Sequence, residues 1–414
     1  MTSRERVLQA IAHREPDHVP VDLGSTPSSG ISAVANNRLV QYLGLDVQPT
    51  QVYDVVQQLA QPDEALLAWF GADVLDIGRA FNTSPAEWVP VTLPDQSPAL
   101  YPAWFQPRKN ATGGWTAHAA DGTPIAAMPA GAMFFDQTCF PFIHGYPSDY
   151  KTLGEAMSKV LWAAFVHSPW DHAHEDGFWD QLRAHALHLR ETTDKALMIV
   201  VGCNLFEWGT FLRRIDQFLM DLVTQPTQVE TLLDALLERH LATLERVCCA
   251  VGDCADIIRF GDDLGMDSGP FMSPAVYRRL FKPRHAQLCA YVKRHSSMHT
   301  FLHSCGGIRP LLPDLIEAGF EIINPVQTSC KGMEPVRLKA DFGKDLTFWG
   351  GGCDTRHILN HATPEAVKAH VRQNLETFAP GGGFVFNPVH NILPDVPPQN
   401  IVALRDAVWE YSNR

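Results

Sequence analysis

The sequence predicts a (β/α)8 barrel, or TIM barrel, and three observations favour this fold class. The chain has 414 residues, a length that a single barrel with insertions can reach. Short runs rich in apolar and β-branched residues alternate with longer stretches of helical periodicity. These short runs number eight, whereas a doubly wound sheet usually has about five to seven strands. We therefore expect a single barrel domain over residues 1–414.

The expected strands share a compact apolar core, and most end in glycine or polar residues. In chain order they are His18–Leu23, Ala72–Ile77, Ala196–Gly202, Asp256–Phe260, Met298–His303, Phe320–Asn324, Leu346–Trp349 and Phe384–Asn387.

Helical signals lie between these runs. An apolar stripe with i, i+3, i+4 and i+7 spacing predicts a long helix near residues 229–244. Ser273-Pro274 and Thr363-Pro364 each pair an N-cap hydroxyl with a proline suited to the first helical position. These signals indicate helices that follow the strands.

One region interrupts the alternation. Residues from about 91 to 150 are rich in Pro, Gly and Trp, and Asp121-Gly122 predicts a hairpin turn between residues 115–118 and 124–126. We interpret this region as an insertion after the second strand that lies over the barrel mouth. A peripheral hairpin without a catalytic part is the alternative.

Composition excludes several classes of partner. The net charge is −13, and the acidic residues are scattered, which argues against nucleic acid and against anionic membrane surfaces. The first residues lack the apolar core of a signal peptide, and no apolar run reaches the length of a membrane span. The nine cysteines fit free thiols better than a disulfide framework. We expect a cytoplasmic protein.

Polar clusters follow six of the predicted strands. Since barrel active sites are built at the carboxyl ends of the strands, we expect these clusters to surround one mouth. They are Cys203, Asn204 and Glu207; Asp262 and Asp263; His303 and Cys305; Asn324 and Gln327; Cys353 and Asp354; and His390 and Asn391.

The His303-Ser304-Cys305 element is the most informative cluster. Side chains two residues apart on a strand point the same way, and imidazole with thiolate suits zinc. We favour His303, Cys305 and His390 as three ligands that leave an open position. Cys353, Glu207 or Asp262 could replace or join them. A buried cysteine beside a hydrogen-bonded histidine is the alternative interpretation.

The chain resembles the uroporphyrinogen decarboxylase superfamily. The resemblance lies in residues 4–11 and 15–21, and it resumes at residues 261–265, 273–274, 303–306, 324–327, 349–351 and 389–392. It implies a (β/α)8 barrel with its site in the carboxyl-end cleft. The superfamily contains a metal-free porphyrinogen decarboxylase and zinc-dependent methyltransferases that work with corrinoid proteins.

Two features favour the methyltransferase branch. The decarboxylases carry an Arg-rich segment after the first strand, whereas residues 22–31 here contain no arginine. The H-x-C element is what the methyltransferases use to bind zinc, although their best-known members have a cysteine where this chain has His390. The resemblance thus implies methyl transfer between a small methylated substrate, such as an O-methyl compound, and a cobalt corrinoid (cobalamin) on a separate protein. A metal-free decarboxylase of a smaller carboxylate, or a non-catalytic scaffold, are the alternatives.

We assign expected roles to the residues around the metal set. Glu207, Asp262, Asp263 and Asn324 are expected to orient the ligands or to donate a proton to the departing oxygen. Apolar and polar substrate contacts are expected from Phe206, Trp208, Gln327 and Asn391, with Trp104, Trp115, Phe134 and Phe135 of the insertion as further aromatic candidates. Whether the protein forms a homodimer is left open.

Overall fold

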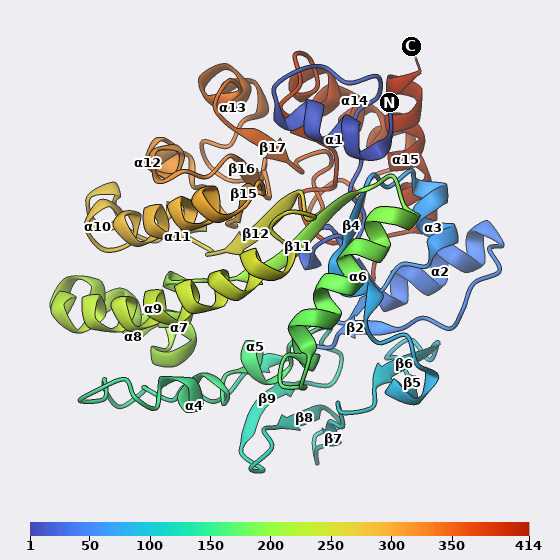
Figure 1. The fold of residues 1–414 in the computed structure, drawn as a ribbon. Coiled ribbons are helices and arrows are strands. Elements are labelled where there is room, and N and C mark those ends of the chain that lie inside the picture. Colours follow the sequence, from blue (N-terminus) through green and yellow to red (C-terminus); the bar gives the residue numbers. More distant parts are fainter. Residues whose placement is uncertain (414) are drawn as a thin grey trace.

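A curled parallel sheet forms the centre of the molecule. The computed structural model describes residues 1–413, and seven parallel strands lie in the order β18-β17-β16-β15-β12-β11-β4 (Figure 1). Seven of the eight predicted strands are confirmed, most of them shortened by a residue or two. The strands are β4 (Val74–Asp76), β11 (Ala196–Gly202), β12 (Ile257–Gly261), β15 (His299–His303), β16 (Ile322–Asn324), β17 (Thr347–Trp349) and β18 (Phe384–Val385).

Residues 18–23, the first predicted strand, do not form a regular strand, but the segment lies where a strand of the barrel would lie. The Phe386 N–H donates to the Pro20 carbonyl at 2.8 Å, and the Asp73 N–H donates to the Val21 carbonyl at 2.7 Å. Pro20 has no N–H, and the Val21 N–H bonds to the Asp73 carboxylate instead of a neighbouring strand. A ladder therefore cannot extend, but the segment still closes the gap between β18 and β4.

The inside of the barrel is apolar at one end and closed there by the first helix. Inward-facing side chains of all seven strands form a buried cluster with Val7, Ala10 and Ile11 of α1 (Ser3–Ile11). This helix covers the amino ends of the strands (Figure 1). Access to the interior is thus limited to the carboxyl ends of the strands.

The remaining helices surround the barrel. The predicted long helix is confirmed as α9, whose apolar stripe is mostly buried. The Ser273 and Thr363 caps are confirmed as well, since each hydroxyl accepts a backbone N–H at the start of α10 and α14. The helices are α2 (Ala33–Leu43), α3 (Glu64–Phe70), α6 (Phe178–Thr192), α7 (Phe206–Arg213), α8 (Ile215–Thr224), α9 (Pro226–Val251), α10 (Pro274–Leu280), α11 (Lys282–His295), α12 (Leu312–Ala318), α13 (Pro335–Phe342), α14 (Pro364–Phe378) and α15 (Pro398–Ser412).

The region after β4 forms small antiparallel sheets on the side of the barrel away from α1 (Figure 1). The hairpin predicted around Asp121-Gly122 is confirmed, because residues 115–118 pair with residues 124–128. The elements of this region are β5 (Trp88–Thr92), β6 (Pro98–Pro102), β7 (Arg108–Lys109), β8 (Trp115–His118), β9 (Pro124–Met128), β10 (Asp136–Gln137), α4 (Leu153–Met157) and α5 (Leu161–Ala164). Shorter strands elsewhere are β1 (Ile31–Ser32), β2 (Val52–Asp54), β3 (Leu59–Ala60), β13 (Gly265–Met266) and β14 (Gly269–Pro270).

Three hydrogen bonds hold the inserted region against the carboxyl end of the barrel. The Trp170 indole donates to the Val200 carbonyl at 2.6 Å. The Gln137 amide donates to the Phe211 carbonyl at 2.7 Å, and the Phe142 N–H donates to the Leu212 carbonyl at 2.7 Å. These bonds place the end of the insertion, and Trp170 in the segment that follows it, beside the mouth.

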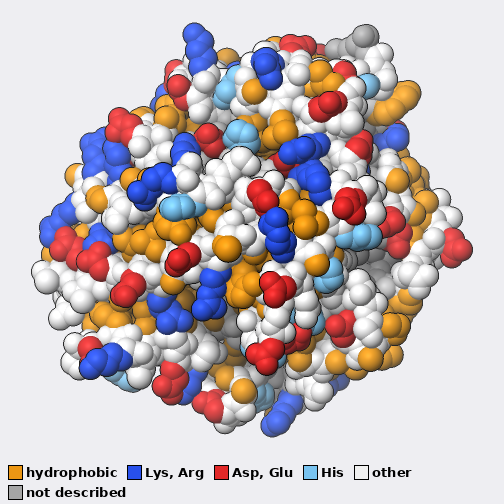
Figure 2. Space-filling view, viewed as in Figure 1, with side chains coloured by type: hydrophobic (Ala, Val, Ile, Leu, Met, Phe, Trp, Pro, Cys, Tyr) orange, Lys and Arg blue, Asp and Glu red, His pale blue; other side chains and the backbone are white. Residues whose placement is uncertain are grey.

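The surface carries mixed charges. Figure 2 shows acidic and basic side chains interspersed over the viewed face rather than gathered by sign. Within residues 1–413, none of the helices combines the length and the apolar character that crossing a bilayer requires.

Candidate metal centre

Three side chains with metal-ligating atoms meet at the carboxyl end of the barrel. His303 is the last residue of β15, Cys305 follows two residues later, and His390 comes from the loop after β18. One ligand atom from each lies within 4.8 Å of the other two. The His303 Nε2 and Cys305 Sγ atoms are 3.4 Å apart, and tetrahedral zinc would hold such a pair about 3.5 Å apart. The donor set and its spacing therefore fit zinc.

Asn324 sets the orientation of the His303 ring. The His303 Nδ1–H donates to Asn324 Oδ1 at 2.7 Å, while Asn324 Nδ2 donates to the Trp349 carbonyl at 2.9 Å. The Trp349 carbonyl can only accept, so the amide oxygen must face His303. This arrangement leaves the His303 Nε2 lone pair directed at Cys305, as in metal sites whose ligands are held by outer partners.

Burial keeps both imidazoles in the form that binds metal. It lowers the pKa of His303 to about 3 and also lowers the pKa of His390. Burial raises the pKa of the Cys305 thiol well above its usual value, and the neighbouring acids raise it further. The thiol is thus protonated without a cation, and metal binding would displace its proton.

The loop that carries Cys305 is held by two polar side chains. The Cys305 N–H donates to Asp263 Oδ1 at 2.8 Å, and the Gly306 N–H donates to Gln327 Oε1 at 2.6 Å. Gly306 has a φ of +92°, and a Cβ there would overlap the Gly265 backbone. Asp263 and Gln327 consequently position the thiol.

A cleft with a cavity volume of about 550 Å³ opens beside this group, and His303 and His390 line it. Five aromatic side chains belong to its lining and are called here the aromatic wall: Trp162, Phe165, Trp170, Trp208 and Phe211. Polar side chains in the same lining include Asp54, Gln57, Glu207, Arg259 and Asp263. The cleft can therefore hold a small, partly apolar molecule next to the candidate metal centre.

Glu207 is the acid whose ionisation is most perturbed in the cleft. Burial raises its pKa well above the usual value, and the charges of Asp263 and Asp262 add to the effect. Its carboxyl group accepts a hydrogen bond from the Asn204 amide. The raised pKa favours the protonated form of Glu207, which suits this carboxyl to donate a proton into the cleft that it lines.

Asp262 and Phe206 differ from their predicted roles. Asp262 is fully buried and accepts the N–H groups of Phe206 and Glu207, at 3.0 and 2.9 Å. It thereby caps the start of α7 and does not line the cleft. The Phe206 ring packs in the core between Phe271 and Phe281 and is not part of the cleft lining. Asp262 is thus turned toward the start of α7, and Phe206, in the first turn of that helix, is turned into the core.

Other predicted residues support the site from behind. Asn391 donates to the Gln57 side chain at 3.1 Å, and Gln57 in turn lines the cleft. Cys353 is fully buried, with its thiol toward its neighbour's carbonyl, and is outside the three-ligand group. The lining does not include Trp104, Trp115, Phe134 or Phe135; Trp104 instead stacks on the lining residue Phe165.

Sequence reasoning missed part of the lining. Trp162, Phe165 and Trp170 follow the insertion, where no periodic pattern marked them. Arg259 was missed because only the residues after the strands were considered. An arginine inside the apolar run of β12 was the available signal, since charged side chains seldom occupy a buried strand without a purpose.

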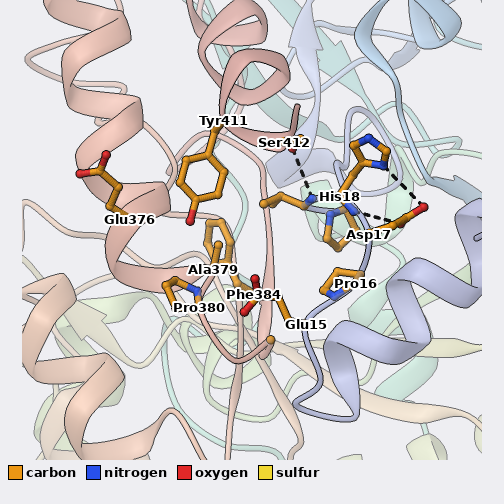
Figure 3. Close-up of a pocket in the computed structure, with 13 residues that line it drawn as sticks. Glu15, Pro16, Asp17, His18, Glu376, Ala379, Pro380, Phe384, Tyr411 and Ser412 are labelled. Atoms are coloured by element: carbon orange, nitrogen blue, oxygen red, sulfur yellow. Dashed lines mark hydrogen bonds and ion pairs between the residues drawn. The ribbon is translucent and has the colours of Figure 1, made fainter. Parts of the chain in front are cut away.

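A second hollow, of about 500 Å³, lies at the opposite end of the barrel. Glu15, Asp17 and His18 line it from the loop after α1, and Glu376 and Tyr411 line it from α14 and α15 (Figure 3). The amino ends of strands and the ends of helices form this hollow, which in a barrel is the end associated with stability.

Comparisons with known proteins agree with this architecture. A structure described as a methyltransferase from Methanosarcina mazei matches with a TM-score of 0.59 and 19% identity, and the match covers 99% of each chain. At this identity the likeness shows the fold. It supports a TIM-barrel-like arrangement.

Curated relatives match over shorter segments. The uroporphyrinogen decarboxylase of Coxiella burnetii is 26% identical over 46% of this chain and 50% of its own length. That of Methylococcus capsulatus is 40% identical over 13% of this chain and 16% of its own length. The Methylcobamide:CoM methyltransferase MtaA of Methanosarcina barkeri is 28% identical over 38% of this chain and 42% of its own length. The chain thus spans half or less of these relatives.

A family model covers the part of the barrel that carries the site. The model described as Uroporphyrinogen decarboxylase (URO-D) matches residues 203–411, about half of the chain. This segment contains β12 to β18 and all three candidate ligands. The chain belongs to the uroporphyrinogen decarboxylase family.

Proposed function

We propose that this protein is a zinc-dependent methyltransferase that moves a methyl group between a small O-methyl substrate and a cobalt corrinoid carried by a partner protein. The observation that carries the proposal is the His303, Cys305 and His390 group beside a cleft with an aromatic wall. Three protein ligands leave one position open for a substrate atom.

The residues of the chain have separable parts in this reaction. Zinc held by His303, Cys305 and His390 would supply Lewis acidity toward the substrate oxygen. Glu207 holds a proton in the cleft and can give it to the departing oxygen. Asn324 and Asp263 hold His303 and the Cys305 loop in place. The aromatic wall orients the substrate and excludes water.

The methyltransferase branch is supported by the relative from M. barkeri, whose printed name describes a methylcobamide methyltransferase. The carboxyl end of the barrel is the end through which a corrinoid protein would reach the substrate, because α1 fills the other end. The partner is therefore expected to dock over the cleft and the segment that follows the insertion.

A metal-free decarboxylase remains the second candidate, because several curated relatives carry the decarboxylase name. A porphyrinogen with many carboxylates would need several guanidinium groups. Residues 22–31 contain no arginine, and Arg259 is the single arginine among the described residues that line the cleft. The cleft thus supports a smaller substrate than a porphyrinogen.

Elemental analysis and a methyl-transfer assay test the proposal together. We expect about one zinc per chain and formation of methylcobalamin when methoxylated compounds are screened with free cob(I)alamin. Conversion of uroporphyrinogen without methyl transfer to any cob(I)alamin acceptor would contradict the proposal. A protein that stays metal-free and active after zinc addition would contradict the ligand assignment.

A further inference from the structure

Arg259 lies inside the barrel directly below the candidate metal centre. It is the third residue of β12, where it pairs with Val200 of β11 and Phe301 of β15. Inward-facing neighbours in the same cluster, including Val200, Ile257 and Phe301, are apolar and buried. Its side chain lines the cleft that His303 and His390 also line.

The Arg259 side chain is half-buried, and no ion pair with a carboxylate or hydrogen bond is seen for it among the described residues. Its Nε atom is buried and has no hydrogen-bond partner. Among the described residues, no carboxylate forms an ion pair with it; Glu207 and Asp263 act on it only over a distance. Leaving a buried donor such as Nε without a partner is costly, so a group that enters the cleft is expected to complete this site.

The nearby acids already have other partners. Asp263 accepts the Cys305 N–H, and Glu207 accepts the Asn204 amide. Asp54 accepts the N–H groups of Val56 and Gln57. Each of these acids is therefore engaged with a partner other than Arg259. The five N–H donors of a guanidinium suit a planar or tetrahedral oxyanion.

We propose that Arg259 binds a carboxylate or sulfonate group of the substrate, so that the cleft selects small molecules that carry both an anionic group and an apolar body. The apolar body would lie along the aromatic wall of Trp162, Phe165, Trp170, Trp208 and Phe211. That the bound molecule is also methylated rests on the proposed function, whereas the anion site rests on Arg259 alone.

Binding measurements on the metal-loaded protein test the anion site without any methyl transfer. Isothermal titration would compare methoxybenzoate and methoxybenzenesulfonate with neutral methoxybenzamide. We expect at least one of the anions to bind at least about tenfold more tightly than the amide, and the tighter of the two identifies the preferred oxyanion.

Substitutions of Arg259 distinguish hydrogen bonding by the guanidinium from the effect of its positive charge alone. Arg259→Gln should abolish the preference for the anions and leave amide affinity unchanged, while Arg259→Lys should keep part of it. Arg356→Gln is the matched control, since Arg356 is a cation that pairs with Asp267 at 2.7 Å and does not line the cleft. This control should retain the wild-type preference, and zinc content measured in each variant reports intact folding.

Two outcomes would overturn the inference: a wild-type protein that binds the amide as tightly as both anions, or an Arg259→Gln variant that keeps the anion preference. If Arg259→Gln does not fold, the wild-type comparison and Arg259→Lys still decide. Anion binding through Arg259 without any methyl transfer would sustain this inference and contradict the proposed function, so the two failures are distinguishable.

Discussion

The two ends of the barrel treat charge in opposite ways. At the amino end, Arg6 bonds to Asp17 at 2.8 Å and to Asp73 at 2.6 Å, and Asp256 accepts from Arg4 and Arg190 at 2.8 and 2.7 Å. At the carboxyl end, Arg259 has no such partner and two histidines are held neutral. Paired charges hold the fold together, whereas the unpaired groups are available to ligands.

The two hollows also differ in whether the charged groups that line them are paired. The hollow at the amino end is lined by loop and helix-end residues such as Asp17 (Figure 3). The Asp17 carboxylate accepts hydrogen bonds from Arg6 and from the amino group of Met1. The cleft at the carboxyl end collects groups from β11, β12, β15 and the loop after β18. In a parallel barrel, the loops after all the strands meet at the carboxyl end. Side chains from several strands can therefore converge on one site there.

Loss of a metal ligand should have the largest effect. Cys305→Ser and His303→Ala should each lower zinc content and reduce turnover by more than about 100-fold, beyond what outer-shell changes usually cost. Elemental analysis and methylcobalamin formation measure both. Cys249→Ser, at an exposed free cysteine, is the control and should behave as wild type. Full zinc content in both ligand variants would refute the assignment.

Breaking the paired charges at the amino end should affect stability alone. Asp73→Ala removes the acceptor for Arg6 and for the Val21 N–H, and we expect a loss of about 3 kcal/mol in the free energy of unfolding. Urea titration measures it. Asp253→Ala, which breaks a surface pair with Arg183, should cost less than about 1 kcal/mol. A fall in zinc affinity in the folded Asp73→Ala protein would contradict the expectation that charges at the amino end affect only stability.

Asn324 should matter for metal binding more than for folding. Asn324→Ala frees the His303 ring to change tautomer and orientation, and zinc affinity should fall by about 10- to 100-fold. Competition with a chromophoric chelator measures this affinity. Asn400→Ala removes a comparably buried asparagine whose amide bonds to the Leu359 and Ala362 carbonyls. Equal zinc affinities in the two variants would reduce Asn324 to a structural residue.

The smallest expected effect concerns acid stability at the amino end. Burial opposes ionisation of Glu321, but hydrogen bonds from His299 and the Thr300 N–H outweigh it and lower its pKa to about 2 from 4.5. Between these values the folded state binds fewer protons than the unfolded state, so stability is lost as the pH falls from 4.5 toward 2. Because the side chain is partly exposed, we expect less than about 1 kcal/mol.

The pH dependence of unfolding in wild type and Glu321→Gln isolates this contribution. The variant should show a shallower loss of stability in that range. If the free energy of unfolding changed equally with pH in both proteins, the Glu321 interactions with His299 and Thr300 would contribute nothing in solution.

Prediction from the sequence succeeded where local patterns carried the information. Seven strands, helix α9 and the hairpin around Gly122 were predictable because apolar periodicity and turn residues act within a few positions. Strand ends also identified His303, Cys305 and His390 as candidates, and the structure brings these three residues together. The first strand was predicted but does not form, because the Val21 N–H bonds to the Asp73 carboxylate and not to a neighbouring strand. The position of Asp73 is set by the tertiary structure.

Sequence alone was therefore enough for the barrel architecture and for the kinds of residue at its mouth, since secondary structure and strand alternation follow from neighbouring residues. Only the tertiary structure could decide which of these residues face one another. Asp262 and Asp263 are adjacent in the chain, yet one caps α7 and the other holds the Cys305 loop. The pairing of Arg6 and the lack of a partner for Arg259 likewise depend on segments far apart in sequence, because Coulomb and hydrogen-bond energies depend on distance in space.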